Sequence, residues 1–114
     1  MTMHPNLARK APCLACLLLA TWIGATPALA ADDKLVTIGN FAFSPAEITI
    51  PAGTTLTFRN DDDMVHSVVA EDGSFRSTGL DTGDTFTFTF SKPGDYAYVC
   101  GLHPFMHGKV KVTQ

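Results

Sequence analysis

The sequence TFTFTF, residues 85–90, alternates threonine with phenylalanine. Successive side chains of a β-strand point to opposite faces of the sheet, so all three phenylalanines would share one face. Both residue types are also common in strands. The stretch therefore predicts a strand whose phenylalanine side packs in the core of a β-sheet protein.

Shorter alternating segments lie on either side of this stretch. They predict further strands near residues 35–38, 48–50, 55–59, 68–69, 96–100 and 109–113. Turn-forming triplets, such as PAG at residues 51–53 and KPG at residues 92–94, separate them. Because no stretch of ten residues shows a helical period, we predict one all-β domain, an antiparallel sandwich of about seven short strands.

The first thirty residues differ from the rest of the chain. Arg9 and Lys10 precede an apolar run, CLACLLLATWIGA, and the segment ends in ALA at residues 28–30. This order is typical of a secretory signal peptide, and the apolar run is shorter than the roughly 20 residues of a membrane-spanning helix. We predict a signal peptide over residues 1–30, cleaved after Ala30, and a mature domain over residues 31–114. An uncleaved membrane anchor is the alternative.

Cleavage would change the composition of the chain. The segment holds two of the eight lysines and arginines, two of the three cysteines and none of the eleven acidic residues. The mature chain of 84 residues would therefore have a formal charge of −5 and a single cysteine, Cys100. An acidic chain is poorly suited to nucleic acid, because binding phosphates requires a basic face. A lone thiol cannot form an internal disulfide in an exported protein, so we expect another group to occupy it.

The segment CGLHPFM begins at Cys100 and places a thiolate, an imidazole and a thioether at Cys100, His103 and Met106. His66 supplies a second imidazole from an earlier part of the chain. Two imidazoles, one thiolate and a weak thioether are the ligands of a blue copper site, and they suit both Cu(I) and Cu(II). His107 is the alternative to Met106 as the fourth ligand, and zinc could occupy the same nitrogen and sulfur atoms.

The same segment resembles the copper-binding loop of the cupredoxin family, most closely the short C-x-x-H-x-x-M loop of its amicyanin branch. Asn60 lies six residues before His66, like the asparagine that precedes the first histidine ligand in cupredoxins, and Met64 also fits the amicyanin branch. The resemblance covers nearly all of residues 34–113. It implies an all-β, antiparallel Greek-key β-sandwich or barrel of about seven to eight strands.

The resemblance also implies one copper ion per chain and a role for each matching residue. His66, Cys100 and His103 would be the strong ligands. Met106 would be the weak axial ligand. We expect His107 to point outward from the site.

Outside the ligands, the resemblance assigns two supporting residues and shows two departures. Asn60 would tie the two ligand loops together, and the backbone N–H of Ser67 would donate to the thiolate sulfur whatever the side chain there. The amicyanin branch usually has Thr-Pro where this chain has Gly101-Leu102. We expect a weaker tie from Asn60, because residue 101 has no hydroxyl, and a less rigid loop, because residue 102 is not proline. Protonation of the exposed histidine ligand would then differ from that of the prolyl loops.

Residues near the expected site have simpler interpretations. We interpret the acidic run at residues 61–63 as a solvated loop. Met64, Pro104 and Phe105 are candidates for an apolar patch around the exposed edge of His103.

The predicted function is that of an exported, periplasmic electron carrier rather than an enzyme. The chain has no H-x-H pair for a multinuclear copper site and no nucleophile elbow. We expect a monomer with redox proteins as donor and acceptor, such as a cytochrome c or a dehydrogenase. We expect neither a nucleic-acid partner nor a membrane span in the mature chain. The alternatives are a periplasmic module for copper delivery or storage, and a metal-free sandwich for adhesion or structure.

Overall fold

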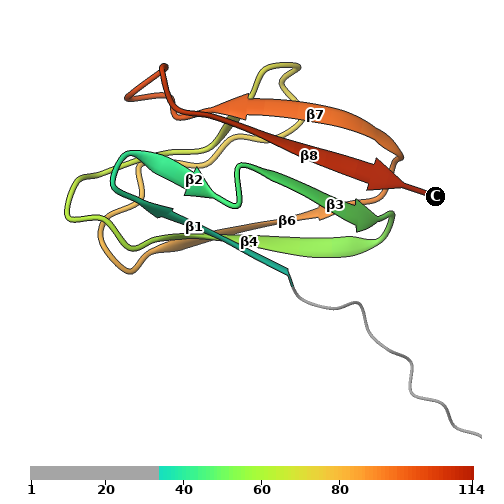
Figure 1. Cartoon of the computed structure of the whole chain (residues 1–114), viewed down its shortest axis with the longest axis horizontal. Helices are drawn as coiled ribbons and strands as arrows, with labels where there is room; N and C mark the ends of the chain where they lie inside the picture. Colours follow the sequence, from blue (N-terminus) through green and yellow to red (C-terminus); the bar gives the residue numbers. More distant parts are fainter. Residues whose placement is uncertain (1–33) are drawn as a thin grey trace, which may run out of the picture.

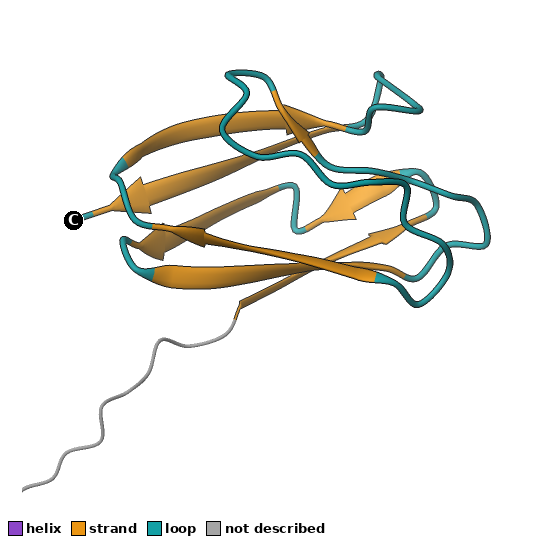
Figure 2. Ribbon diagram, turned by 180° about the vertical axis from the view of Figure 1, so that it is seen from behind, coloured by secondary structure: helices purple, strands orange, loops and turns teal. Residues whose placement is uncertain are grey.

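A computed structural model of the chain describes residues 34–114, and eight β-strands form two packed sheets (Figure 1). The strands are β1 (Lys34–Gly39), β2 (Ala42–Ser44), β3 (Glu47–Pro51), β4 (Thr54–Asn60), β5 (Val69–Ala70), β6 (Thr85–Phe90), β7 (Gly94–Val99) and β8 (His107–Thr113). The predicted signal peptide, residues 1–30, lies outside the described residues. The described part of the chain contains no helix that could cross a membrane (Figure 2).

The two sheets are mixed, a detail that the prediction of an antiparallel sandwich did not include. One sheet has the order β2-β1-β4-β6 and the other has the order β3-β8-β7-β5. β1 pairs with β4 in parallel, and β3 pairs with β8 in parallel, whereas the other pairs are antiparallel. Alternation along a strand records which face is buried but not which strand lies beside it, so it could not reveal the two parallel pairs.

The phenylalanines of β6 lie on the inner face of the first sheet, as the sequence predicted. Phe90 is fully buried, and Phe86 and Phe88 pack against the core. Their neighbours across the sandwich include Phe75, whose ring centroid lies 5.1 Å from that of Phe88 and 5.4 Å from that of Phe90. The threonines of β6 face solvent. Burial of one face of each sheet therefore provides the hydrophobic stabilisation of the sandwich.

Two strands differ from the sequence prediction. β2 has only three residues and was not predicted, because so short a segment shows no period. The segment predicted around residues 68–69 forms only the two-residue strand β5, at the edge of the second sheet.

Three loops meet at one end of the sandwich, away from the C-terminus (Figure 1). They are the turn between β1 and β2, the segment that leads from β4 to β5, and the loop between β7 and β8. The second of these crosses from one sheet to the other. Because the loops carry all the predicted ligands, the fold brings residues that are far apart in sequence to one place.

Candidate metal centre

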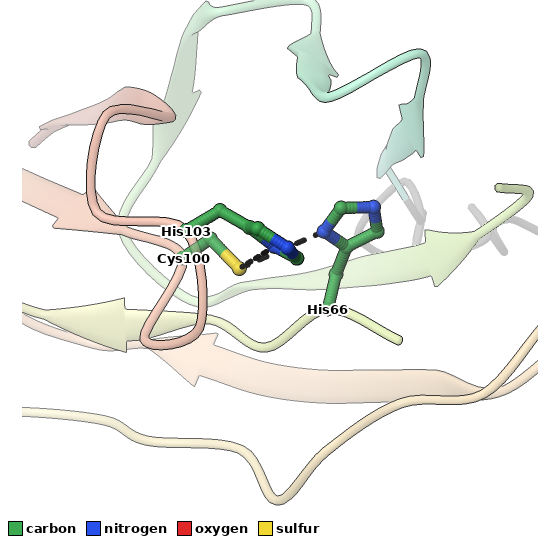
Figure 3. Close-up of side chains that lie close together, drawn as sticks. All are labelled: His66, Cys100 and His103. Atoms are coloured by element: carbon green, nitrogen blue, oxygen red, sulfur yellow. Dashed lines mark hydrogen bonds between the residues drawn. The ribbon is translucent and has the colours of Figure 1, made fainter. Parts of the chain in front are cut away.

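Three side chains converge between these loops. The Sγ of Cys100 lies 3.7 Å from the Nδ1 of His66 and 3.7 Å from the Nδ1 of His103 (Figure 3). All three atoms lie within 4.8 Å of one another. Cys100 and His66 are fully buried and His103 is half-buried, so the group has one exposed side.

The spacing of these atoms fits a trigonal metal site. Metal bonds are about 2.0 Å long to imidazole nitrogen and about 2.3 Å long to thiolate sulfur, so a nitrogen and a sulfur ligand at 120° lie about 3.7 Å apart. Both nitrogen-to-sulfur distances are 3.7 Å. The donor set, with two imidazoles, one thiolate and a methionine on the same loop, fits copper better than a harder ion.

Backbone hydrogen bonds close the loop that carries most of the predicted ligands. The N–H of Cys100 donates to the carbonyl of Met106 over 3.2 Å, and the N–H of Met106 donates to the carbonyl of His103 over 2.9 Å. Met106 is buried, while its neighbour His107 is exposed at the start of β8. The loop therefore keeps Met106 inside and directs His107 outward, which leaves Met106 as the candidate for the fourth ligand.

His66 is held by a short two-sided bridge to Leu80. The N–H of His66 donates to the carbonyl of Leu80 over 3.1 Å, and the N–H of Leu80 donates to the carbonyl of His66 over 2.7 Å. Asn60 supports the same region, because its Nδ2 donates to the carbonyls of Met64 and Leu80, each over 2.8 Å. Together, the bridge to Leu80 and the hydrogen bonds of Asn60 fix the backbone from which the buried imidazole of His66 extends.

The contacts of Asn60 differ from the expectation that it ties the two ligand loops together. Its side chain organises the segment after β4 and reaches Leu80, and its hydrogen bonds do not include the Cys100–Met106 loop. The link between the ligand loops comes from Ser67 instead. Its N–H donates to the Sγ of Cys100 over 3.3 Å, and its Oγ accepts the N–H of Gly101 over 2.9 Å. The N–H donation is the one that the sequence analysis expected, and the hydroxyl of Ser67 adds a second link that it did not expect.

Hydrogen bonds stabilise the thiolate form of Cys100. Burial alone would raise its pKa, but donation from the N–H of Ser67, together with the imidazoles of His66 and His103, lowers the pKa to about 6. Opposing effects of this kind favour the charged form when several donors surround a buried group. The metal-free site is thus prepared to present a thiolate, the form that binds metals.

Asp62 contacts the buried histidine from its outer side. Its Oδ2 lies 2.9 Å from the Nε2 of His66, and this hydrogen bond lowers the pKa of Asp62 to about 2. Burial would lower the pKa of His66, but its hydrogen bonds to Asp62 and Cys100 raise it overall. If Nδ1 of His66 held a metal, Nε2 would keep its hydrogen and would donate it to the carboxylate of Asp62. The interpretation of residues 61–63 as a solvated loop is therefore wrong for Asp62.

Exposed apolar side chains lie on the three loops that meet at the site. Met64 and Phe105, two of the residues proposed from sequence, are 46% and 66% exposed. The structure adds residues that sequence reasoning missed, namely Phe41, Val65 and Leu102. Phe41 is the most distant in sequence, and no local pattern could have linked it to the ligands.

Comparison with known proteins agrees with this geometry. A family model for the cupredoxin-like domain matches residues 13–112. The chain belongs to this family. It is 36% identical over 87 residues to an amicyanin from Paracoccus versutus, in a match that covers 72% of this chain and 66% of that protein. An amicyanin from Paracoccus denitrificans is 31% identical over 122 residues, which cover 88% of this chain and 92% of the relative.

A solved structure supports the same assignment to the cupredoxins. A purple cupredoxin from Nitrosopumilus maritimus matches with a TM-score of 0.67 and 34% identity, over 70% of this chain and 99% of that one. The predicted family, its likeness to amicyanin and the β-sandwich of seven to eight strands are thus confirmed. Copper is the cofactor that this cupredoxin site fits.

Proposed function

We propose that this cupredoxin is an exported type 1 blue copper protein that carries single electrons between redox partners. The observation that carries the proposal is the convergence of two imidazole nitrogens and one thiolate sulfur within 4.8 Å, at the end of a cupredoxin sandwich. We assign His66, Cys100 and His103 as the strong ligands and Met106 as the axial ligand. Similarity to amicyanins supports the assignment to an electron carrier rather than an enzyme.

The residues of the site favour rapid electron transfer because they are held in place before the electron arrives. Copper, when bound, supplies a centre that alternates between Cu(I) and Cu(II). The bridge to Leu80 holds His66, and the contacts of Ser67 hold the thiolate of Cys100. A donor to the sulfur also stabilises the electron-rich thiolate and thereby raises the reduction potential. Little of the protein has to move when the charge of the site changes.

His103 is the proposed route for the electron. It is the only one of the three converging ligands in the described residues that is not fully buried. Exposed apolar residues, including Phe105 and Met64, lie at the same end of the molecule. A small apolar interface suits a carrier that must dissociate quickly from each partner.

The partners we propose are redox proteins, such as a cytochrome c or a dehydrogenase. The formal charge of −5 over residues 31–114 would steer a basic partner. We propose periplasmic, monomeric action, on the basis of the signal-like residues 1–30 and the likeness to amicyanin.

The experiment combines the midpoint potential, the electron self-exchange rate and the rate of copper loss to a chelator. An electron carrier should give reversible one-electron voltammetry, fast self-exchange and slow copper loss. Rapid copper loss with slow self-exchange would contradict electron transfer and favour copper delivery. Slower transfer to a basic cytochrome at higher salt would support electrostatic steering, and a rate independent of salt would contradict it.

A further inference from the structure

The turn between β1 and β2 adopts a backbone conformation that its sequence does not favour. Asn40 and Phe41 have φ angles of 53° and 58°, in the left-handed region. Gly39 and Ala42 pair on either side of them, so the two residues form the whole connection of the hairpin. Asparagine tolerates this region, but a bulky phenylalanine is an outlier there. A two-residue hairpin connection of this type requires positive φ at both positions, and strained residues held in this way cluster at functional sites, which directs attention to the ring of Phe41.

The ring of Phe41 lies over both imidazoles of the site. Its centroid is 5.4 Å from that of His66, with an interplanar angle of 86°, and 5.1 Å from that of His103, with an angle of 88°. Edge-to-face pairs at these distances are attractive. Phe105 stacks on the same ring from the outside, at 6.3 Å and 30°. Phe41 therefore contacts both ligands that flank the thiolate, although it is 59 residues from Cys100 in sequence.

The turn is also tied to the buried histidine through one carboxylate. The N–H of Phe41 donates to the Oδ2 of Asp62 over 3.3 Å. The same oxygen lies 2.9 Å from the Nε2 of His66. Asp62 thereby connects the backbone of the turn to the imidazole beneath its ring, and any shift of the turn would be transmitted to His66.

We propose that Phe41 is a positioning residue whose ring covers the metal centre. The ring fixes the planes of His66 and His103 and excludes water from the space beside the thiolate. This rests on the proposed function and deepens it. A ring in contact with both imidazoles restricts their rotation about χ2 and occupies the side from which a solvent molecule would approach. The residues around the metal then stay the same in both charge states of the site, which keeps the reorganisation small.

The first test uses the Cu(II)-loaded protein and azide, a small anion that binds copper when a position is open. Visible and electron paramagnetic resonance spectra are recorded with and without azide for wild type, Phe41→Ala, Phe41→Leu and Phe41→Tyr. Phe105→Ala is the matched control, because it removes a more exposed aromatic ring from the same patch. We expect azide to change the spectra of Phe41→Ala, to leave wild type and Phe105→Ala unchanged, and to have little effect on Phe41→Tyr. Phe41→Leu should resist azide but show altered resonance parameters, since it covers the site without an aromatic edge.

The second test uses the metal-free protein and so does not depend on copper. The rate at which a disulfide reagent attacks Cys100 is measured at a pH above the pKa of the thiol, so that the thiolate fraction is equal in all variants. Cys100 is fully buried beside the two imidazoles that the ring of Phe41 contacts. We expect several-fold faster reaction in Phe41→Ala than in Phe105→Ala or wild type.

Backbone strain is tested separately by comparing two variants that both lack the ring. Glycine accepts the left-handed region and alanine does not, so Phe41→Gly should unfold at a temperature about 4 °C above that of Phe41→Ala. If Phe41→Gly unfolded at the same temperature as Phe41→Ala or at a lower one, the inferred backbone strain at position 41 would be contradicted.

If Phe41→Ala matched wild type in its azide response and in its thiol reactivity, the proposal that Phe41 covers the site would be contradicted. Effects of Phe105→Ala on these two measurements as large as those of Phe41→Ala would also contradict it. A wild-type protein that takes up no copper would defeat the proposed function. The thiol measurement would then still decide whether Phe41 covers the site.

Discussion

At the residue scale, Ser67 and Gly101 complement each other. The hydroxyl of Ser67 accepts the N–H of Gly101 over 2.9 Å. A Cβ at position 101 would lie 2.9 Å from that hydroxyl oxygen and 3.1 Å from a methyl group of Val69, so a side chain there would force its neighbours apart. The absence of a hydroxyl at residue 101, which the sequence suggested would weaken the loop, is offset by the serine on the facing segment.

Ser67→Ala should loosen this connection while it keeps the backbone donor to Cys100. Loss of one neutral hydrogen bond is expected to lower the free energy of unfolding by about 1 kcal/mol. The measurement is urea unfolding of the metal-free protein, with the exposed Ser91→Ala as the control. Equal midpoints for the two variants would show that the Ser67 hydroxyl does not hold the loop.

The thiol of Cys100 should titrate far below its ordinary value in the folded, metal-free protein. The donors around it lower its pKa from 9.0 to about 6. A pH titration of the ultraviolet absorbance of the thiolate should therefore show a midpoint near pH 6 that is missing in Cys100→Ser. A midpoint near pH 9 would mean that the donors do not act on the sulfur.

The same shift has a defined effect on stability. Because the pKa of Cys100 is lower in the folded protein than in the unfolded chain, ionisation of this thiol adds to the free energy of unfolding. This stabilisation is fully present above pH 9, where the thiol of the unfolded chain is also ionised. This contribution is lost as the pH falls from 9 to 6 and is absent below that. Denaturant unfolding across this range should show the trend in wild type and a weaker one in Cys100→Ser.

At the scale of the elements, sequence reasoning succeeded where one face of a strand is buried over several residues. β4 and β6 show strict alternation of burial or residue type, and both were predicted. β2 and β5 have three and two residues, too few for a period, and their existence depends on pairing with β1 and β7. The parallel pairing of β1 with β4 is likewise a property of the assembled sheet.

Gly108 illustrates a requirement that only the paired strands reveal. It lies opposite Tyr98 in the β7–β8 pair, and a Cβ at this position would come within 2.2 Å of the Tyr98 ring. Tyr98 is fully buried against Phe43 and Phe58, so it has no room to move.

Gly108→Ala should therefore lower the free energy of unfolding by about 2–3 kcal/mol through overpacking. Gly39→Ala is the matched control, because nothing lies within 4 Å of the Cβ that it would add. Chemical denaturation compares the two. A Gly108→Ala protein as stable as Gly39→Ala would contradict the described packing of Tyr98.

At the scale of the whole molecule, the metal centre joins the two sheets. His66 lies on the segment that crosses from β4 of one sheet to β5 of the other, and Cys100 follows β7 of the second sheet. The sequence motif predicted Cys100, His103 and Met106 because their spacing within one loop is local, whereas His66 had to be added from an earlier segment. Phe41 and Asp62 escaped prediction, because they reach His66 only after the hairpin and the loop have folded against each other.

Metal removal should therefore lower the stability of the whole sandwich. A ligand that binds only the folded state stabilises it by about 2.7 kcal/mol when its free concentration is 100 times the Kd. Thermal unfolding with copper and after chelation measures this difference, and His66→Ala serves as the control that has lost a ligand. A midpoint of thermal unfolding that is the same with copper and after chelation would favour a metal-free structural role.

The central claim is that the thiolate of Cys100 is a ligand of a blue copper ion. The most direct measurement is the visible absorption spectrum of the copper(II)-loaded protein beside that of Cys100→Ser. The account predicts an intense blue colour in the wild type that disappears in Cys100→Ser while the variant stays folded. A colourless wild type, or a colour that survives in Cys100→Ser, would contradict it.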